Sequence, residues 1–371
     1  LQDPFGVAVD RSGDLYVADT GNARVLRAPE GGGSQTTLGI SGLTDPFGVS
    51  VGPAGEVVVA DSGNNRVVRL ATAMPQLRVT TSPALPAEIL VDGVARDSWG
   101  LNWPILPLGS HQVCFGHVPG YTEPPCQDVQ LTLGAPTVTV QGTYIQNGYL
   151  RVITSPAVAS TITVDSIPRN DWGLWAEVPT GSHQVCFGAV AGYNAPSCRT
   201  VSVTAGGTAT TTGTFTVNPS APGPTGSFGY LRATTDPPAG AMISLDGAWR
   251  NNWGLDWVKI PTGVHVACWG AWPNTTGPTG CPQLDVTEGQ TTTISGTYAA
   301  KGFLRVTTAP ALPGNIVVDG EVRNAFGMWT SMKPGPHTVC FGPVEGYLTP
   351  SCQAVTVTAG ESAAVNGTYT Q

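Results

Sequence analysis

Four short stretches of the sequence decide the fold: LRVTTSP at residues 77–83, LRVITSP at residues 150–156, LRATTDP at residues 231–237 and LRVTTAP at residues 304–310. Each opens a unit that closes on the motif GTY or GTF. The closing aromatic residues are Tyr144, Phe215, Tyr298 and Tyr369. A pattern that returns at a regular spacing marks repeated supersecondary units. The chain therefore contains four copies of one module.

The interior of each unit is typical of β-structure. In the first unit Ile89 and Val91 alternate with other residues, as in a strand with one buried face. Asp92-Gly93 follows, and such pairs supply the positive φ of a tight hairpin turn. The equivalent pairs are Asp165-Ser166, Asp246-Gly247 and Asp319-Gly320. Several short strands without a helical period predict a small β-sandwich for each unit.

Composition narrows the class of protein further. The 371 residues include 48 Gly and 32 Pro but only 11% charged residues, which fits short strands joined by many turns. A formal net charge of −8 disfavours a phosphate-binding surface, so we expect no nucleic-acid partner. The sequence lacks the run of about 18 apolar residues that crosses a bilayer, so we expect no membrane insertion.

The cysteines follow the repeats. Two fall in each unit, separated by 12 or 13 positions: Cys114 and Cys126, Cys186 and Cys198, Cys268 and Cys281, Cys340 and Cys352. This regularity predicts one disulfide per unit, which would stabilise a small core by roughly 2–4 kcal/mol. Metal binding is the alternative, but it usually needs four ligands in one unit. Persistent disulfides predict an extracellular or cell-surface location.

The N-terminal residues resemble NHL repeats. The first copy, residues 4–28, has Pro4, Gly6, Val7, Val9, Asp19, Asn22, Arg24 and Val25; the second copy, residues 46–70, has Pro46, Gly48, Val49, Val51, Asp61, Asn65, Arg66 and Val67. The resemblance implies two blades of a β-propeller. Two blades cannot close a ring, so we expect further blades upstream or a partner that covers the open edges. Asp19 and Asp61 are expected in blade turns, with a calcium site as the alternative; no other cofactor or metal is expected.

The four later units resemble PEGA domains, small β-rich modules of bacterial and archaeal surface proteins. The likeness lies in LRVTTSP…ILVDG, the turn at Pro107 and Gly109, HQVCF, and the Gly120-Tyr121 pair. It implies a role in surface architecture or interaction rather than catalysis. The Trp-rich segment and the paired cysteines depart from the common PEGA pattern.

The predicted organisation is all-β: an incomplete propeller segment followed by a linear array of four disulfide-stapled sandwich domains. The expected boundaries are 1–73 for the two blades, 76–145, 148–217, 228–299 and 302–371 for the four modules, and 218–227 for a Pro/Gly-rich linker. The other junctions between modules are only a few residues long and restrict rotation. We therefore expect a rod with one hinge, at the linker.

An aromatic segment in each module is the candidate interaction surface. Its residues are Trp99, Trp103, Trp172, Trp175, Trp253, Trp257, Phe326 and Trp329. One ring of each pair is expected to plug the end of the small sandwich. The other is expected to be exposed to neighbouring domains, another subunit or sugar rings. The adjoining Arg96, Arg169, Arg250 and Arg323 are candidates to stack on these rings.

The sequence offers no catalytic constellation. His111, His183, His265 and His337 hold equivalent positions in successive modules, a whole domain apart in a linear array. Each is expected to be a partly buried strand residue that bonds a backbone group. Nucleophile-elbow, zinc-protease and P-loop motifs are all missing from the sequence. We therefore predict that the chain is not an enzyme.

Three functions remain open. The leading hypothesis is an extracellular structural protein, a stalk or the subunit of a surface fibre assembled through β-domain contacts, with self-association or other surface proteins as partners. The second is a carbohydrate-binding adhesin that uses the Trp-rich loops. The third is the non-catalytic part of a larger secreted propeller enzyme.

Overall fold

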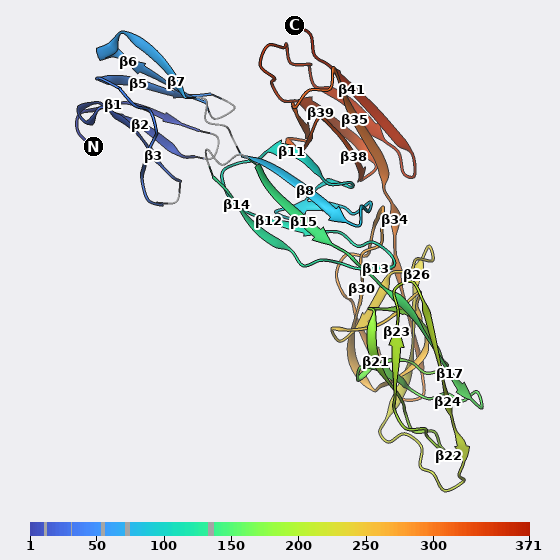
Figure 1. The fold of residues 1–371 in the computed structure, drawn as a ribbon. Coiled ribbons are helices and arrows are strands. Elements are labelled where there is room, and N and C mark those ends of the chain that lie inside the picture. Colours follow the sequence, from blue (N-terminus) through green and yellow to red (C-terminus); the bar gives the residue numbers. More distant parts are fainter. Residues whose placement is uncertain (11–12, 31, 53–55, 71–74, 133–136) are drawn as a thin grey trace.

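The computed structural model describes residues 1–10, 13–30, 32–52, 56–70, 75–132 and 137–371, and Figure 1 shows their arrangement. The described chain is all-β, as predicted, and its only helical elements are 3-10 turns at Thr20–Asn22 and Ser62–Asn64. Among these residues no helix combines the length and apolar character that spanning a membrane requires. Residue 73, where the blades were predicted to end, lies outside the described ranges.

The N-terminal region contains two antiparallel sheets with the strand order of successive blades, β1-β2-β3-β4 and β5-β6-β7. Their strands are β1 (Pro4–Val9), β2 (Leu15–Asp19), β3 (Arg24–Ala28), β4 (Thr36–Thr37), β5 (Pro46–Val51), β6 (Val57–Asp61) and β7 (Arg66–Leu70). Tyr16, Val25, Val57 and Val59 are buried between the two sheets. Strand β1 is an edge strand of the first sheet.

The first module consists of a four-stranded sheet, β10-β9-β12-β14, a three-stranded sheet, β11-β8-β15, and a two-stranded sheet, β13-β16. Its strands are β8 (Gln76–Ser82), β9 (Ile89–Val91), β10 (Val94–Asp97), β11 (Leu101–Ile105), β12 (Gly109–Phe115), β13 (Tyr121–Thr122), β14 (Gln127–Leu131), β15 (Thr137–Thr143) and β16 (Ile145–Gln146). The opening strand β8 pairs in parallel with the closing strand β15. The two larger sheets enclose a core that includes Leu77, Ile89, Val91, Val113 and Phe115.

The other modules repeat the two larger sheets; the two-stranded sheet recurs in modules 2 and 3, and a single bridge between Leu348 and Thr370 takes its place in module 4. Module 2 contains β17 (Gly148–Ser155), β18 (Ile162–Val164), β19 (Ile167–Asn170), β20 (Leu174–Val178), β21 (Gly181–Phe187), β22 (Tyr193–Asn194), β23 (Arg199–Val203), β24 (Thr208–Thr214) and β25 (Thr216–Val217). Module 3 contains β26 (Phe228–Asp236), β27 (Met242–Leu245), β28 (Ala248–Asn252), β29 (Leu255–Pro261), β30 (Gly263–Trp269), β31 (Thr275–Thr276), β32 (Gln283–Val286), β33 (Thr291–Thr297) and β34 (Ala299–Ala300). Module 4 contains β35 (Gly302–Ala309), β36 (Asn315–Val318), β37 (Glu321–Ala325), β38 (Gly327–Met332), β39 (Gly335–Phe341), β40 (Gln353–Val357) and β41 (Ser362–Thr368).

The closing motif GTY has a packing reason. A Cβ on Gly142 would lie 2.4 Å from the ring of Phe115, so only glycine lets β15 pass over that ring. The hydroxyl of Tyr144 donates a hydrogen bond to the carbonyl oxygen of Gly116 at 2.6 Å. Glycine has the same role at Gly213, Gly296 and Gly367, which lie against Phe187, Trp269 and Phe341.

The modules follow one another along the chain as predicted, but in space they do not form a single extended rod. Module 1 lies beside module 4 and module 2 lies beside module 3, so that two pairs stack end to end (Figure 1). In the first pair β10 and β11 pack on β37. In the second pair β19 packs on β28. The array therefore folds back on itself, so that modules 3 and 4 run antiparallel to modules 1 and 2.

The Pro/Gly-rich linker is where the chain reverses. Asn218 donates its backbone N–H to the carbonyl oxygen of Gly192 at 2.8 Å, and Gly192 donates to the carbonyl oxygen of Ala221 at 3.2 Å. The start of the linker is therefore bonded to module 2. The reversal differs from the hinge of an open rod because it brings modules 2 and 3 into lateral contact.

Candidate interaction surfaces

Each module contains one disulfide, and each joins the two cysteines of the same unit: Cys114–Cys126, Cys186–Cys198, Cys268–Cys281 and Cys340–Cys352. The first cysteine of each pair lies on the central strand of the four-stranded sheet, at β12, β21, β30 and β39. The bond closes the loop that leaves this strand. None of the cysteines is free.

The blade motif forms one hydrogen-bond network in each copy. Asp19 is fully buried; its Oδ2 accepts hydrogen bonds from Asn22 at 2.9 Å and from Arg24 at 2.7 Å. Burial opposes ionisation, but the hydrogen bonds from the Gln2 amide, Arg24 and Asn22 outweigh it and lower the pKa of Asp19 to about 2. The carboxylate oxygens that a calcium ion would need are thus engaged by the protein itself.

The second blade repeats the network with one change from the sequence interpretation. Asp61 is bonded by the Thr44 amide, by Arg66 and by Asn64. Asn64, rather than the predicted Asn65, is therefore the motif asparagine. Asn65 instead has a left-handed backbone, φ 46°, and ends the 3-10 turn.

The four equivalent histidines share one geometry. In module 1 the Nδ1 of His111 is 2.7 Å from Asp92 Oδ2, and its Nε2 donates to the carbonyl oxygen of Pro107 at 2.8 Å. The same pairs join His183 to Asp165, His265 to Asp246 and His337 to Asp319. One ring nitrogen faces a carboxylate oxygen and the other faces a backbone carbonyl oxygen. Each histidine thus connects the Asp-containing turn to its own strand. Its hydrogen bond to a backbone carbonyl oxygen matches the prediction.

The aromatic segments differ from the expectation that one ring per module fills the core. Trp103 is half-buried, and all the other rings are exposed: Trp99, Trp172, Trp175, Trp253, Trp257, Phe326 and Trp329. The cores are filled instead by aliphatic side chains and by Phe115 and its equivalents. The opening and closing strands already fill the small interior, so the tryptophans remain outside.

The arginines that stack on these rings are also different from the predicted ones. Arg78, on the opening strand, lies over Trp103 at 5.4 Å. The equivalent pairs are Arg151 with Trp175, Arg232 with Trp257 and Arg305 with Trp329. These arginines alternate outward on the opening strand, and Arg151 and Arg305 stand directly opposite their tryptophans across the sheet. Each module thus carries an exposed cation–π pair.

The predicted arginines join the modules in pairs. Arg96 Nη1 donates to the carbonyl oxygen of Val322 in module 4, and Arg323 Nη1 donates in return to the carbonyl oxygen of Ala95. The second pair also has reciprocal arginine bonds: Arg169 Nη1 donates to the Arg250 carbonyl oxygen at 3.2 Å, and Arg250 Nη1 to that of Pro168 at 2.8 Å. In the first pair equivalent residues exchange equivalent bonds, which gives that pair local two-fold character; in the second pair one of the two acceptors is shifted by one residue.

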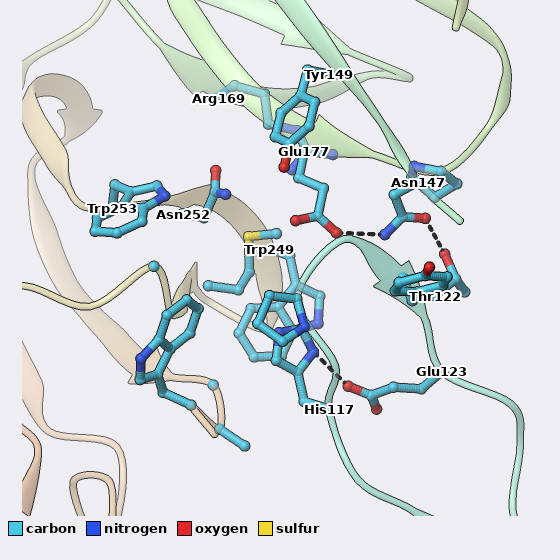
Figure 2. Close-up of a pocket in the computed structure, with 18 residues that line it drawn as sticks. His117, Thr122, Glu123, Asn147, Tyr149, Arg169, Glu177, Trp249, Asn252 and Trp253 are labelled. Carbon is cyan, nitrogen blue, oxygen red and sulfur yellow. Dashed lines mark hydrogen bonds and ion pairs between the residues drawn. The ribbon is translucent and has the colours of Figure 1, made fainter. Parts of the chain in front are cut away.

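A cavity of about 670 Å³ lies where modules 1, 2 and 3 meet. In Figure 2, Trp253 of module 3 lies on one side, Asn147, Thr122 and Glu123 lie on the other, and Trp249 lies between them. Glu177 accepts a hydrogen bond from Asn147 at 2.7 Å, Thr122 donates to Asn147 Oδ1 at 2.5 Å, and His117 is 2.8 Å from Glu123. Sequence interpretation missed this site, although Trp249 and Trp272 have no aromatic counterpart in the sister modules.

Comparison with known proteins supports the blade resemblance. The family model described as NHL repeat matches residues 1–27 and 43–70. No curated protein matches the chain significantly. The likeness of the four modules to PEGA domains stays a prediction.

The solved structures that match the chain include a Bacillus anthracis protein and two pilins. The Bacillus anthracis TIE protein is 12% identical over 99% of this chain and 74% of its own, with a TM-score of 0.20. The streptococcal ancillary pilin is 9% identical over 60% of this chain and 99% of its own, with a TM-score of 0.24. The shaft pilin SpaA of Lactobacillus rhamnosus GG is 10% identical over 61% of this chain and 98% of its own, with a TM-score of 0.16. At these scores the likeness carries no conclusion about function.

Proposed function

We propose that this chain is an extracellular, non-enzymatic structural protein, the subunit of a surface stalk or fibre assembled through its β-domains. The single observation that carries the proposal is the reciprocal pairing of modules through Arg96 and Arg323 and through Arg169 and Arg250. A surface that equivalent modules use to bind each other is self-complementary. The same surface is able to join modules of different chains.

The disulfides support the extracellular part of the proposal. Each of the four small cores is closed by its own covalent bond. Such bonds persist in oxidising environments and are rare in the cytosol. A chain of modules stabilised in this way suits a load-bearing position outside the cell.

The propeller segment supplies a second contact surface. Phe5, Val7 and Val9 on the edge strand β1 are 65, 63 and 58% exposed. Apolar residues on an unpaired strand edge favour pairing with another chain. We propose that this edge is the junction with a neighbouring subunit or with a further blade.

Assembly is testable on the purified chain by light scattering and electron microscopy over a range of concentrations. We expect concentration-dependent oligomers or filaments that are lost when Val7→Lys places a charge on the edge strand. Discrete monomers at all concentrations would overturn the fibre proposal. A Val264→Lys variant is the control, because Val264 is 66% exposed but lies on β30, an inner strand of its sheet.

Carbohydrate binding is the second candidate function, favoured by the exposed tryptophans. Trp99 and Trp172 are 61 and 64% exposed and belong to equivalent segments of modules 1 and 2. Exposed aromatic rings on a rigid sheet are surfaces on which sugar rings stack. A glycan array probed with the intact chain tests this candidate, and the absence of binding to every glycan would exclude it.

A further inference from the structure

Four of the positions at which module 3 departs from its sister modules line the cavity shared by modules 1, 2 and 3. Trp249 stands where the others have Ala95, Pro168 and Val322, and Trp272 stands where they have Val118, Val190 and Val344. Gly240 replaces Pro86, Ala159 and Pro313, and Met242 replaces Glu88, Thr161 and Asn315. Departures that converge on one cavity indicate a task that the other modules do not share.

Gly240 leaves space for the rings of Trp253 and Trp272, which form one side of the cavity. A Cβ on Gly240 would lie 2.7 Å from the ring of Trp272 and 2.9 Å from that of Trp253. Because Gly240 has no Cβ, the rings of Trp272 and Trp253 approach each other edge to face, with centroids 6.0 Å apart. Trp249, 47% exposed, adds a third indole to the cavity. Three large apolar faces are therefore held at a site that remains open to solvent.

The opposite wall is polar and rigid. Asn147 belongs to the short junction between modules 1 and 2, and its side chain bonds both Thr122 and Glu177. Glu177 also accepts the backbone N–H of Gly120 at 3.1 Å. His117 and Glu123 form a second polar pair, and the His117 ring lies 6.4 Å from Trp272 (Figure 2). These bonds fix the carboxylate and amide groups at the cavity edge before any ligand binds.

We propose that this cavity binds a neutral oligosaccharide. A pyranose ring has an apolar C–H face, which matches an indole, and hydroxyl groups around its edge, which match carboxylate and amide oxygens and nitrogens. The volume lies within the range of about 300–1,000 Å³ that is usual for small-ligand sites. Two carboxylates, Glu123 and Glu177, and one guanidinium, Arg169, line the cavity. The excess of negative charge disfavours anionic sugars, so the ligand is neutral.

The inference rests on the carbohydrate-binding candidate but assigns the binding to a different set of residues. The test measures binding of cellohexaose, maltohexaose, xylohexaose, mannohexaose and chitohexaose to the intact chain by calorimetry and by intrinsic tryptophan fluorescence. We expect at least one of them to bind. Trp272→Val restores the residue of the sister modules, so that variant folds, and we expect it to weaken binding at least about tenfold.

Two further variants sharpen the test. Gly240→Ala pushes a methyl group against Trp272 and Trp253 and should narrow the cavity, with a loss of affinity similar to that of Trp272→Val. The matched control is Leu348→Ala, since Leu348 is 67% exposed and lies in module 4, outside the cavity, and the affinity of this variant should equal that of the unaltered chain.

The outcomes separate the cavity from the wider function. Binding that is lost in Trp172→Ala and retained in Trp272→Val would overturn the cavity and keep the carbohydrate-binding candidate. No binding of any of the five oligosaccharides at millimolar concentration would overturn the cavity proposal, and a glycan array that also stayed blank would remove the candidate function. Binding of proline-rich peptides in place of sugars would likewise overturn the inference.

Discussion

Reciprocal arginine bonds join the modules in both pairs. The pair formed by modules 1 and 4 also has a polar network that the other pair lacks among the described residues. Asn324 donates to Asp97 Oδ2 at 2.5 Å and accepts the backbone N–H of Asn102 at 2.7 Å. Asn315 exchanges two bonds with the backbone of Ile105, at 3.1 and 3.0 Å. In the second pair Asp171 accepts the backbone N–H of Lys259 at 2.5 Å.

Chain connectivity gives a reason for the difference. The arginine bonds join residues 226 positions apart in the first pair and 81 apart in the second. Closing the longer loop costs about 1 kcal/mol more in chain entropy. The linker, moreover, brings modules 2 and 3 together directly. The pair that must close the longer loop therefore has the larger number of specific bonds.

The largest effect is expected at Asn324. Asn324→Ala removes a hydrogen-bond donor from the buried Asp97 carboxylate and leaves the Asn102 amide without its acceptor, which should weaken the first pair by about 3 kcal/mol. Hydrogen exchange of β10 and β37, followed by mass spectrometry, should show faster exchange in both strands.

The matched change is Asn251→Ala in module 3, at the equivalent position. Asn251 Nδ2 bonds the carbonyl oxygen of Gly254 in its own module at 3.2 Å, and its buried Oδ1 has no partner within the described chain. We expect exchange of β19 and β28 to stay close to that of the unaltered protein. An equal increase in hydrogen exchange in the two variants would contradict the idea that the pair formed by modules 1 and 4 depends on its polar network.

The next effect concerns pH. Burial at the interface raises the pKa of Asp97 to about 6, and the hydrogen bonds from Asn324 and the Ser98 and Trp99 amides only partly offset this. When the pair opens, the carboxyl returns to its ordinary value near 3.8. The closed pair thus binds the proton more tightly, and lowering the pH from 7 to 4 should stabilise it by about 2 kcal/mol.

Hydrogen exchange of β10 and β37 across that range is the measurement, with rates corrected for intrinsic pH dependence. Asp97→Asn should abolish the response, because the amide does not titrate. Protection that fell steadily from pH 7 to pH 4 in the unaltered chain would show that the sign is wrong.

A smaller effect is expected from the arginines that both pairs share. Arg96→Ala and Arg169→Ala each leave a carbonyl oxygen of the partner module unbonded, at a cost of about 1 kcal/mol. The cost is limited because Nε of each arginine is buried without a partner among the described atoms. Thermal unfolding should show a similar small loss in both variants. A large loss of thermal stability in only one of the two variants would mean that the arginine bonds do not contribute equally to the two pairs.

Sequence patterns predicted the content of each module but not the relation between modules. The Asp-Gly turns, the alternation in LRVTTSP and the cysteine spacing are local, and each has a local physical cause. The sequence predicts only that Arg96 stacks on a neighbouring ring and gives no prediction for Asp97 or Asn324, because nothing in a single sequence indicates a partner more than 200 positions away. The cavity left a detectable signal in Trp249 and Trp272, which appears only when the four units are aligned with each other.

The smallest effect tests the exposed cation–π pairs. Trp175 is 55% exposed and lies 5.7 Å from Arg151, so Trp175→Ala should cost module 2 only about 0.5 kcal/mol. Trp103, in the first pair, is half-buried and meets Phe326 of module 4 edge to face at 6.2 Å. Trp103→Ala should therefore lower the free energy of unfolding by more than Trp175→Ala does, and it should also loosen the contact between modules 1 and 4. Thermal unfolding gives both values. Both tryptophans stack on the equivalent arginine of the opening strand, although Asn102 rather than Trp103 stands opposite Arg78 in the sheet. The excess loss at Trp103 therefore measures mainly what contact with module 4 adds.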